Sequence, residues 1–435
     1  MKLLYANDRR GEYPPSLYAE TCAALDRFPP LRGETRADVA VVGAGYTGLS
    51  AALHLARAGR DVVLVDAQRV GFGASGRNGG QIGSGQRQEV DWLERRFGRG
   101  TARRLWDLAE DAKALVRSLA AEAGVPIRPG IAHAPRRPTE VRHSETMAAH
   151  LAAHYGYDKV QPLDRDAMAA HLGSDAYAGG DVDWGAGHVQ PLALALGMAR
   201  LAVAAGVRIH EGTHVHRIDH GTSATRSRVL CDTGRIACDH VILAGNGYQG
   251  RLDARVAARV MPINNYIVAT EPLGERFPEI LPQRTAAADT KFVVNYWRLD
   301  DDRRLIFGGG ETVGYRFPSD IGGLVRPHLL SVYPQLREVA ITHAWGGTLA
   351  ITMNRMPHFA RPAPNCLSAG GYSGHGVALA ALAGRMMADA VGGQSEGFDA
   401  MAAIPARPFP GGSMLRGPLL VAGMAWYGLR DRLGV

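Results

Sequence analysis

The clearest pattern of apolar and polar positions lies in the N-terminal part of the chain. A short β-branched run, 38–42, leads into the glycine-rich segment 43–48, and apolar residues then recur at helical spacing up to Gly59. A second apolar run, 61–65, follows and ends at Asp66. This order of strand, glycine turn, helix and strand predicts a βαβ unit with two parallel strands.

Helical and strand-like patterns alternate along the rest of the chain. Helices are expected at 101–123, 140–155 and 191–205, the last with a proline in its first turn. Shorter β-like runs are expected at 207–210, 228–231, 260–270, 292–299 and 304–307. The pattern therefore predicts an α/β chain in which segments of two domains interleave.

The glycine turn matches the spacing G-x-G-x-x-G, and each glycine has a physical role. Gly43 permits the tight turn, Gly45 lets a pyrophosphate approach the backbone, and Gly48 lets the helix pack on the strand. The helix N-terminus then presents its positive end to the phosphates. Asp66 would accept hydrogen bonds from a ribose and would disfavour a 2′-phosphate. The motif predicts a Rossmann-like dinucleotide site, but by itself it does not separate NAD from FAD.

Composition and charge exclude several classes of protein. Hydrophobic residues make up 46% of the 435 positions and charged residues 21%, as in ordinary globular proteins. These values exclude a disordered chain, a disulfide miniprotein and a polytopic membrane protein. The net charge is +7, but only four of the 49 basic residues are lysines and the arginines are spread along the chain. We therefore expect no nucleic-acid partner.

The cysteines and the C-terminal apolar run complete this survey. The four cysteines form no C-x-x-C pair and no zinc spacing, and no signal peptide is apparent at Met1. We expect free thiols, no metal site and a cytoplasmic location. The apolar run 418–429 is shorter than the ~20 residues of a spanning helix, so no transmembrane segment is expected. It predicts a helix that packs on its own or a neighbouring subunit, with docking to a membrane surface or partner as the alternative.

The segment 73–81, Gly-Ala-Ser-Gly-Arg-Asn-Gly-Gly-Gln, indicates which dinucleotide is bound. It closely resembles the loop that lies along the flavin in the D-amino-acid-oxidase-like (DAO, glycine oxidase/sarcosine oxidase) superfamily, and especially in its γ-glutamylputrescine oxidase branch. Similar segments extend over nearly the whole chain, at 15–21, 213–218, 239–248, 304–309, 345–347 and 370–377. The resemblance implies a glycine/sarcosine-oxidase-like fold with non-covalently bound FAD.

The resemblance also implies a division of the chain into domains. A lead-in is expected at 1–34 and a linker with a C-terminal helical tail at 396–435. The Rossmann-like, discontinuous FAD-binding domain is expected to comprise 35–95, 190–250 and 340–395. The substrate domain, with a mixed sheet, is expected to comprise 96–189 and 251–339.

The cofactor-binding residues expected from the motif and the resemblance fall in five places. The dinucleotide motif contributes Gly43, Ala44, Gly45, Tyr46, Thr47, Gly48, Asp66, Ala67, Gln68 and Arg69. The loop along the flavin contributes Gly73, Ala74, Ser75, Gly76, Arg77, Asn78, Gly79, Gly80 and Gln81. The adenine strand, the return strand and the C-terminal motif contribute Val215, Gly245, Gly371, Tyr372, Ser373, Gly374, His375, Gly376 and Val377. A helix expected to start at Ser373 or Gly374 would direct backbone N–H groups toward negative charge on reduced flavin.

Candidates for the substrate face are aromatic and histidine residues in segments that the resemblance places near the flavin. They are Tyr266, Tyr296, Trp297, Trp345, His358, Tyr372 and His375, the last with its backbone rather than its ring as the expected contact. Aromatic rings suit a cationic amine through cation–π contact, with ordinary core packing as the alternative for each. His343 and His358 are candidates for titration near neutrality, again with a structural role as the alternative.

Two departures from the family pattern bear on the chemistry. In the sarcosine-oxidase branch a lysine on the strand equivalent to 305–307 aids oxygen reactivity, and this strand has no lysine here. Amino-acid oxidases also clamp the substrate carboxylate with an arginine, for which Arg298, Arg316 and Arg355 are candidates. Cys366 lies near the C-terminal motif, but the branch resembled holds its flavin without a covalent bond.

The leading hypothesis is FAD-dependent oxidation of a small-molecule amine similar to γ-glutamylputrescine. The C–H bond next to nitrogen would be oxidised to an imine, which hydrolyses to an aldehyde. O2 would reoxidise the flavin and give H2O2, with another electron acceptor as the alternative. Two further hypotheses are a D-amino-acid or glycine/sarcosine-type dehydrogenase and a flavin-binding scaffold subunit. The C-terminal helix would serve a homo-oligomer or partner contact.

Overall fold

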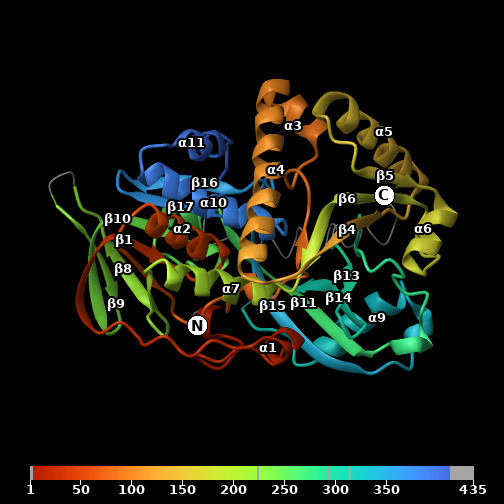
Figure 1. Ribbon diagram of the computed structural model, residues 1–435, viewed down its shortest axis with the longest axis horizontal. Helices are drawn as coiled ribbons and strands as arrows, with labels where there is room; N and C mark the ends of the chain where they lie inside the picture. Colours follow the sequence, from red (N-terminus) through yellow and green to blue (C-terminus); the bar gives the residue numbers. More distant parts are fainter. Residues whose placement is uncertain (1–2, 223–224, 292, 313–314, 412–435) are drawn as a thin grey trace.

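Two β-sheets stand side by side in the computed structural model, with helices packed on them and between them (Figure 1). The structure describes residues 3–222, 225–291, 293–312 and 315–411. The predicted helix at 418–429 lies outside these residues.

The first sheet contains the predicted βαβ unit and has a parallel centre. Its strand order is β16 (His358–Ala363), β17 (Cys366–Gly370), β10 (Gly234–Leu243), β1 (Gly33–Val42), β2 (Val62–Val65) and β7 (Arg208–His210). All neighbours in this order are parallel except β16 and β17. A ribbon of β8 (Val215–Asp219) and β9 (Ser227–Cys231) pairs with β10.

Alternating side chains of the parallel strands supply two hydrophobic cores. Val39 and Val41 of β1 pack with the helices α2 (Tyr46–Arg57), α4 (Arg99–Glu122), α7 (Pro191–Ala204) and α10 (Gly376–Val391). Ala40 and Val42 point the other way and pack with apolar residues of β8 and β9. Because other elements cover both faces of the sheet, nearly every residue of these strands is apolar. Such continuous apolar runs are easily predicted from the sequence.

The second sheet is mixed and larger. Its strand order is β15 (Ile341–Ile351), β11 (Met261–Pro272), β14 (Arg304–Thr312), β13 (Tyr296–Leu299), β12 (Ala286–Asp289), β4 (Ile127–Ala134), β6 (Gly180–Val189) and β3 (Gln81–Ile82), and β5 (Val160–Leu163) also pairs with β6. The helices α5 (Pro138–Tyr155), α6 (Arg165–Leu172) and α9 (Ile321–Leu330) lie around this sheet, and the long α4 stands between the two sheets (Figure 1).

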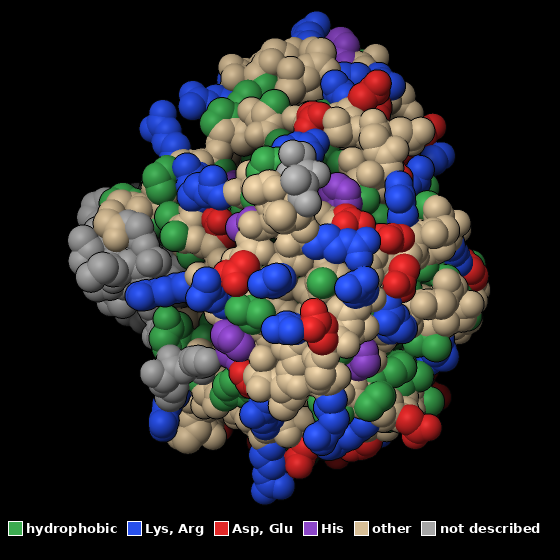
Figure 2. Space-filling model, turned by 90° about the vertical axis from the view of Figure 1, so that its left-hand side faces the viewer, with side chains coloured by type: hydrophobic (Ala, Val, Ile, Leu, Met, Phe, Trp, Pro, Cys, Tyr) green, Lys and Arg blue, Asp and Glu red, His purple; other side chains and the backbone are tan. Residues whose placement is uncertain are grey.

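Short elements complete the described chain. They are α1 (Leu17–Thr21), α3 (Val90–Phe97), α8 (Ala254–Ala257) and α11 (Glu396–Ala402), with the 3-10 turns η1 (Leu3–Tyr5), η2 (Ala74–Gly76), η3 (Asn246–Tyr248), η4 (Gly274–Arg276) and η5 (Pro334–Leu336). In the described part of the chain, no helix combines the length and the apolar character that crossing a membrane requires. Basic and acidic side chains intermingle on the face shown in Figure 2.

The predicted α/β fold class is confirmed, while three segments pair or pack across the expected division into domains. Strand β15 lies within 340–395, which was assigned to the nucleotide fold, but it pairs with β11 of the second sheet. Strand β3 lies within 35–95 and pairs with β6. Helix α4 lies within 96–189, assigned to the substrate domain, yet it packs in one core with α2 and α10. The domain boundaries stay a prediction.

The crossing of α2 and α10 is close enough to test. A Cβ atom on Gly384 of α10 would lie 2.2 Å from the carbonyl oxygen of Thr47 and 2.7 Å from the backbone nitrogen of Ala51. We predict that Gly384→Ala lowers the free energy of unfolding by about 1–3 kcal/mol, because backbone atoms must move. Urea denaturation measures this change.

Gly100→Ala is the matched control for this prediction. Gly100 lies near the start of α4, where an added Cβ meets nothing within 4 Å. Alanine is favoured over glycine in helices by up to ~1 kcal/mol, so we expect no loss of stability. Equal destabilisation by both changes would contradict the close packing of α2 on α10.

Candidate active site

One large cavity of about 1490 Å³ lies between the two sheets. Its wall includes the ends of β1 and β2, the loop around 72–79, η3 and the segment 372–377, together with residues of β4, β6 and β14 from the second sheet. Sites for a single drug-sized ligand are typically ~300–1,000 Å³. The cavity therefore has room for a dinucleotide and a second molecule.

The glycine motif forms the turn between β1 and α2. Gly43 has a φ of +109°, and a Cβ there would lie 2.8 Å from the carbonyl oxygen of Ala244. A Cβ on Gly48 would lie 1.8 Å from the carbonyl oxygen of Gly43, so this position is closed to any side chain. Gly45 is the N-cap of α2 and leaves it without a side-chain cap, and the first turn holds no acidic residue. The positive end of α2 is therefore open to an anion in the cavity.

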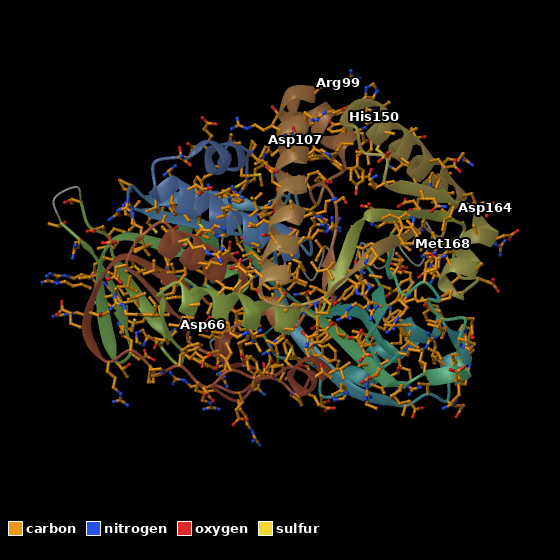
Figure 3. All side chains as sticks on the ribbon, in the orientation of Figure 1. Asp66, Arg99, Asp107, His150, Asp164 and Met168 are labelled. Carbon is orange, nitrogen blue, oxygen red and sulfur yellow. The ribbon has the colours of Figure 1, made fainter. Side chains whose placement is uncertain are left out.

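Asp66 is a fixed acceptor at the end of β2. Its carboxylate accepts the backbone N–H groups of Ala44 at 2.7 Å and Gln68 at 2.8 Å. Burial raises its pKa to about 6, and these two hydrogen bonds oppose the rise. Asp66 lines the cavity beside the first sheet, across α4 from the labelled side chains of α6 (Figure 3). At neutral pH the group is mostly ionised and oriented for a ribose hydroxyl.

The loop 73–81 is held by its own hydrogen bonds. The amide of Asn78 donates to the carbonyl oxygens of Ala74 at 2.9 Å and Ser75 at 3.0 Å, and its oxygen accepts the N–H of Gly80 at 2.7 Å. The hydroxyl of Ser75 accepts the N–H of Tyr46 at 3.0 Å, which joins the loop to the start of α2. The cavity-lining backbone of this loop is thus set before any ligand binds.

Arg77 anchors the loop on the side away from the cavity. Its buried guanidinium donates to the carbonyl oxygens of Phe72 at 2.6 Å and Gly346 at 3.0 Å, and pairs with Asp8 at 2.8 Å. The indole N–H of Trp345 donates to the carbonyl oxygen of Arg77 at 3.1 Å. Arg77 and Trp345 therefore connect the loop to β15 and the N-terminal segment rather than facing a ligand.

The segment before α10 forms a second open helix end. Helix α10 begins at Gly376 with His375 as its N-cap, later than the predicted start at Ser373 or Gly374. These two residues instead take the left-handed conformation, with φ of +53° and +88°. The His375 side chain lies 3.1 Å from the carbonyl oxygen of Gly85 and does not cap the helix, and the first turn holds no acidic residue. Burial lowers the pKa of His375 to about 4, so its ring is neutral at physiological pH.

The predicted cofactor residues divide into those that line the cavity and those that support it. Among the described residues, those that line it are Gly43, Gly45, Tyr46, Thr47, Asp66, Ala67, Gly73, Ala74, Ser75, Asn78, Gly79, Gln81, Val215, Gly245, Tyr372, Ser373, Gly374, His375, Gly376 and Val377. The supporting residues, which do not line it, are Ala44, Gly48, Gln68, Arg69, Gly76, Arg77, Gly80 and Gly371. In Gly48, Gly76 and Gly80, an added Cβ would meet backbone oxygens.

The structure separates the predicted substrate-face residues. Tyr296 and Tyr372 line the cavity, whereas Tyr266, Trp297, Trp345 and His358 do not. Tyr266 and Trp297 belong to the hydrophobic core of the second sheet. His358 is buried in β16, and burial lowers its pKa to about 4. For these residues core packing is the correct interpretation.

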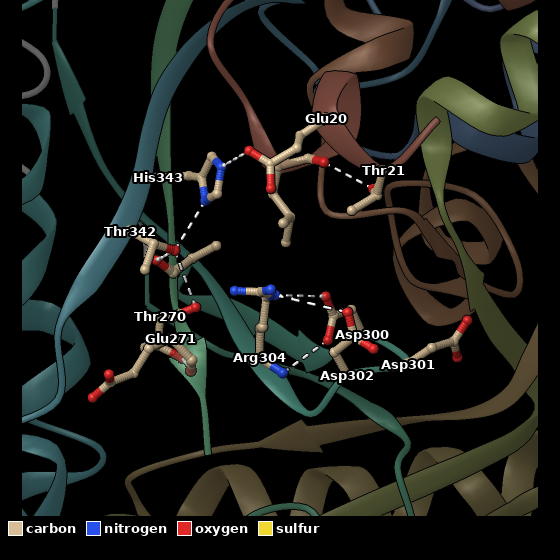
Figure 4. Close-up of polar contacts among 12 residues, drawn as sticks. Glu20, Thr21, Thr270, Glu271, Asp300, Asp301, Asp302, Arg304, Thr342 and His343 are labelled. Carbon is tan, nitrogen blue, oxygen red and sulfur yellow. Dashed lines mark hydrogen bonds and ion pairs between the residues drawn. The ribbon is translucent and has the colours of Figure 1, made fainter. Parts of the chain in front are cut away.

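His343 and the start of β14 also lie outside the cavity lining. Figure 4 shows their polar contacts. His343 Nε2 is 2.9 Å from a carboxylate oxygen of Glu20, and its Nδ1 is 2.9 Å from the hydroxyl of Thr342. Arg304 lies 3.8 Å from a carboxylate oxygen of Asp300. This cluster joins β14, β15 and α1 at the surface and contributes nothing to a ligand site.

Among the three predicted arginine clamps, only Arg355 lines the cavity. Arg298 instead donates to the carbonyl oxygen of Gly79 at 3.0 Å. Glu311 and Arg87, which line the cavity with Arg355, belong to no motif and were not predicted. Burial raises the pKa of Glu311 to about 7, opposed by the charges of both arginines, and burial lowers the pKa of Arg87 to about 10.

A sequence comparison defines the class of protein to which this site belongs. Residues 38–390 match the model of the DAO family, described as FAD dependent oxidoreductase. The chain belongs to this family, and the protein is an FAD-dependent oxidoreductase. The open N-termini of α2 and α10, the ordered loop 73–81 and the Asp66 carboxylate fit such a cofactor.

Particular relatives span almost the whole chain. The chain is 42% identical to "Probable oxidoreductase OrdL" of Rhizobium meliloti (strain 1021), covering 96% of this chain and 97% of that protein. It is 39% identical to "Gamma-glutamylputrescine oxidoreductase" of Escherichia coli (strain K12), covering 98% and 100%. The crystal structure of glycine oxidase from Geobacillus kaustophilus superposes with a TM-score of 0.70 at 23% identity, covering 82% and 95%. The last likeness concerns the fold alone.

The space at Gly45 gives a prediction for cofactor binding. A Cβ at this position would lie 2.8 Å from the hydroxyl oxygen of Ser75, and it would narrow the approach to the α2 N-terminus. We predict that Gly45→Ala weakens FAD binding at least about tenfold, or ~1.4 kcal/mol. Fluorescence titration of the apoprotein with FAD measures this change.

The double variant Gly45→Ala/Ser75→Ala shows whether the loss of affinity comes from a clash with Ser75 or from lost space for the cofactor. Ser75→Ala alone is the control. Removing the hydroxyl relieves the contact within the protein but leaves the methyl group facing the cavity. We expect FAD affinity to stay low in the double variant. Recovery to the affinity of Ser75→Ala would show that the cofactor does not need this space.

Proposed function

We propose that the protein oxidises the primary amine of an elongated substrate similar to γ-glutamylputrescine and passes electrons to O2, giving H2O2. The family membership and the 39% identity to the named oxidoreductase support this choice. The observation that carries it is a half-buried carboxylate, Glu311, inside a cavity that has room for a reaction partner larger than a minimal amino acid.

The proposed place of the cofactor follows from the cavity wall. The pyrophosphate would bind at the N-terminus of α2 beside Gly45, and the ribose would bind Asp66. The flavin would lie between the loop 73–81 and the segment 372–377, where the N-terminus of α10 stabilises negative charge. When bound there, FAD supplies the hydride acceptor.

Glu311 is proposed to bind the substrate ammonium and accept its proton. Hydride leaves only a carbon next to a neutral amine, so one proton must move from the ammonium to a carboxylate oxygen of Glu311 before oxidation. A pKa near 7 suits this transfer because the group is ionised at physiological pH yet accepts a proton readily. The positive charges of Arg87 and Arg355 favour the ionised carboxylate and so oppose the rise in the pKa of Glu311.

The two aromatic residues of the cavity are proposed to form apolar walls around the amine. The hydroxyl of Tyr296 donates to the side-chain oxygen of Asn265, and the hydroxyls of Tyr372 and Thr47 share a hydrogen bond of 2.7 Å. With both hydroxyls occupied, the rings present their apolar surfaces. Such surfaces favour a cation through its charge and exclude water from the reacting carbon.

A dehydrogenase that uses another electron acceptor is the second candidate. The observation in its favour is that β14 carries no lysine between Arg304 and Thr312. The two candidates share every step up to the oxidised amine and differ only in how the reduced cofactor is reoxidised.

We predict that anaerobic γ-glutamylputrescine bleaches the visible flavin absorbance of the holoenzyme, whereas D-alanine and sarcosine do not. The reason is that a short amino acid leaves most of this large cavity unfilled and makes few of the contacts that would orient it. Stopped-flow absorbance measures the bleaching. Admission of air should then release peroxide, and a bleached enzyme that stays reduced in air would favour the dehydrogenase. Bleaching by D-alanine in place of γ-glutamylputrescine would contradict the proposed substrate.

We predict that Glu311→Gln lowers kcat/KM for γ-glutamylputrescine by about 100-fold, because general acid–base groups contribute typically 10²–10⁴-fold. In the wild-type enzyme kcat/KM should fall as the pH drops through about 7, since Glu311 becomes protonated. The variant should lose this inflection.

Glu20→Gln is the matched control, because Glu20 pairs with His343 outside the cavity lining. It should keep both the rate and the inflection. If Glu311→Gln retained the inflection near pH 7, another group would be the proton acceptor.

A further inference from the structure

The wall of the cavity formed by β4 and β6 carries charged residues that amine oxidation does not use. In the antiparallel register His133 lies opposite Asp181, and Ile131 lies opposite Asp183. The intervening residues Ala132 and Val182 belong to the core on the other face of the sheet. The alternation along each strand therefore directs the histidine and both aspartates to the cavity side.

His133 and Asp181 form an ion pair with a defined orientation. His133 Nδ1 is 2.8 Å from a carboxylate oxygen of Asp181. The Asp181 side chain is 8% exposed and also accepts a hydrogen bond from the hydroxyl of Ser144 on α5. The His133 side chain is 45% exposed and lines the cavity. In the described part of the chain Nε2 has no hydrogen-bond partner, so it is the atom open to a ligand.

The surroundings keep the imidazole of His133 protonated. Burial alone would lower its pKa, but the carboxylates of Asp181, Asp183 and Glu89 raise it to about 9. The nearby ring of His375 is neutral. His133 therefore presents a charged N–H donor to the cavity at physiological pH.

The other carboxylates facing this part of the cavity already have partners. Asp183 accepts the hydroxyl of Tyr157 at 2.5 Å and the N–H of Gly185 at 2.9 Å. Lys113 of α4 supports this group by donating to the same tyrosine hydroxyl at 3.1 Å.

The charged residues near α5 and at the end of β12 also have partners. Glu89 is paired with His143 at 2.6 Å, and Glu140 with Arg137 at 2.9 Å. Asp289 of β12 accepts the backbone N–H of Asn295. These groups already have partners within the described chain, whereas His133 Nε2 is a charged donor that lines the cavity without one, so an anion is the ligand that it fits.

The distance between His133 and Glu311 limits the size of the ligand. A row of cross-strand neighbours leads from Gly308 on β14 through Tyr296 and Ala288 to His133 on β4, and Glu311 lies three residues beyond Gly308 on β14. Three steps of ~4.8 Å give roughly 14 Å from Gly308 to His133, so the backbone positions of Glu311 and His133 are at least that far apart. An α-amino acid cannot reach both groups, whereas a molecule as long as about four residues of extended chain can.

We propose that His133, held by Asp181, binds a carboxylate at the end of the substrate remote from the amine that is oxidised. The ligand class is an ω-amino amide with a distal carboxylate, as in a γ-glutamyl amide. Only the identity of the amine end rests on the proposed function. His133 is thus a specificity-determining residue that selects substrates by their negative charge and by their length.

The test uses a ligand that cannot be oxidised. N-butyl-γ-glutamine keeps the γ-glutamyl carboxylate but lacks the terminal amine, and its carboxamide analogue lacks the negative charge. Each is titrated into the holoenzyme at pH 8 while the visible flavin spectrum is recorded. The carboxylate should bind wild type ten- to a hundredfold more tightly than the carboxamide, in the range of a charge-assisted hydrogen bond. His133→Gln should remove this preference.

His343→Gln is the matched control, because His343 also pairs with a carboxylate but lies outside the cavity lining. It should keep the preference for the carboxylate. The inference is overturned if wild type shows no preference or binds neither compound, or if His133→Gln retains the preference.

A pH series with Asp181→Asn tests the positioning role of the aspartate. Without this carboxylate the pKa of His133 should fall toward its usual value of ~6.5. The variant should then prefer the carboxylate at pH 6 but lose that preference at pH 8, whereas wild type keeps it at both. An unchanged preference at pH 8 would overturn the role of Asp181. Turnover of γ-glutamylputrescine is a separate measurement, so failure of the proposed reaction leaves this binding result intact.

Discussion

The close packing of α2 on α10 is the constraint on which the rest of the site depends. Gly384 brings the backbones of the two helices together near Thr47, and the first residues of both helices line the same cavity. Neither helix has an acidic residue in its first turn, and neither is capped by the side chain of its own N-cap residue. Two positive helix ends therefore converge on one space, and an anionic cofactor satisfies both. Glycines such as Gly48 and Gly384 are needed because neighbouring backbone lies where a side chain would be. Space for a ligand is a second consequence of the same geometry.

The loop 73–81 is held in place by residues from both sides of the cavity. Arg77 belongs to the loop 73–81, which lines the cavity. Its side chain nevertheless points away, to Gly346 of β15 and to Asp8 of the N-terminal segment. Trp345 contacts the same loop from the second sheet. The loop is thus fixed by groups from both sides, so cofactor-facing backbone and substrate-facing side chains keep one relative position. A preorganised site of this kind needs little rearrangement when it binds its ligands.

The sequence could predict the parts of the site that are local in the chain. The βαβ unit is one continuous pattern, and its glycines and Asp66 lie within a short span, so the structure places most of them around the cavity as expected. The second wall is different, because β4 contains Pro129 and Gly130 and gives little strand signal. His133 and Asp181 are 48 positions apart and meet only through strand register. Register also explains why several aromatic candidates belong to the core. The one local signal was the alternation of polar and apolar residues at 181–183.

The two ends of the elongated site are tuned in opposite ways, which follows from what each must do. At Glu311 burial raises the pKa to about 7, so the carboxylate can give up its charge when it takes a proton from the substrate. At His133 the carboxylate of Asp181 overcomes burial and keeps the positive charge in place. A reacting end needs a group that changes its protonation state, and a recognition end needs one that does not. These groups stand on β14 and β4, which two other strands separate. The fold therefore places the reacting group at one end of the ligand and the recognition group at the other.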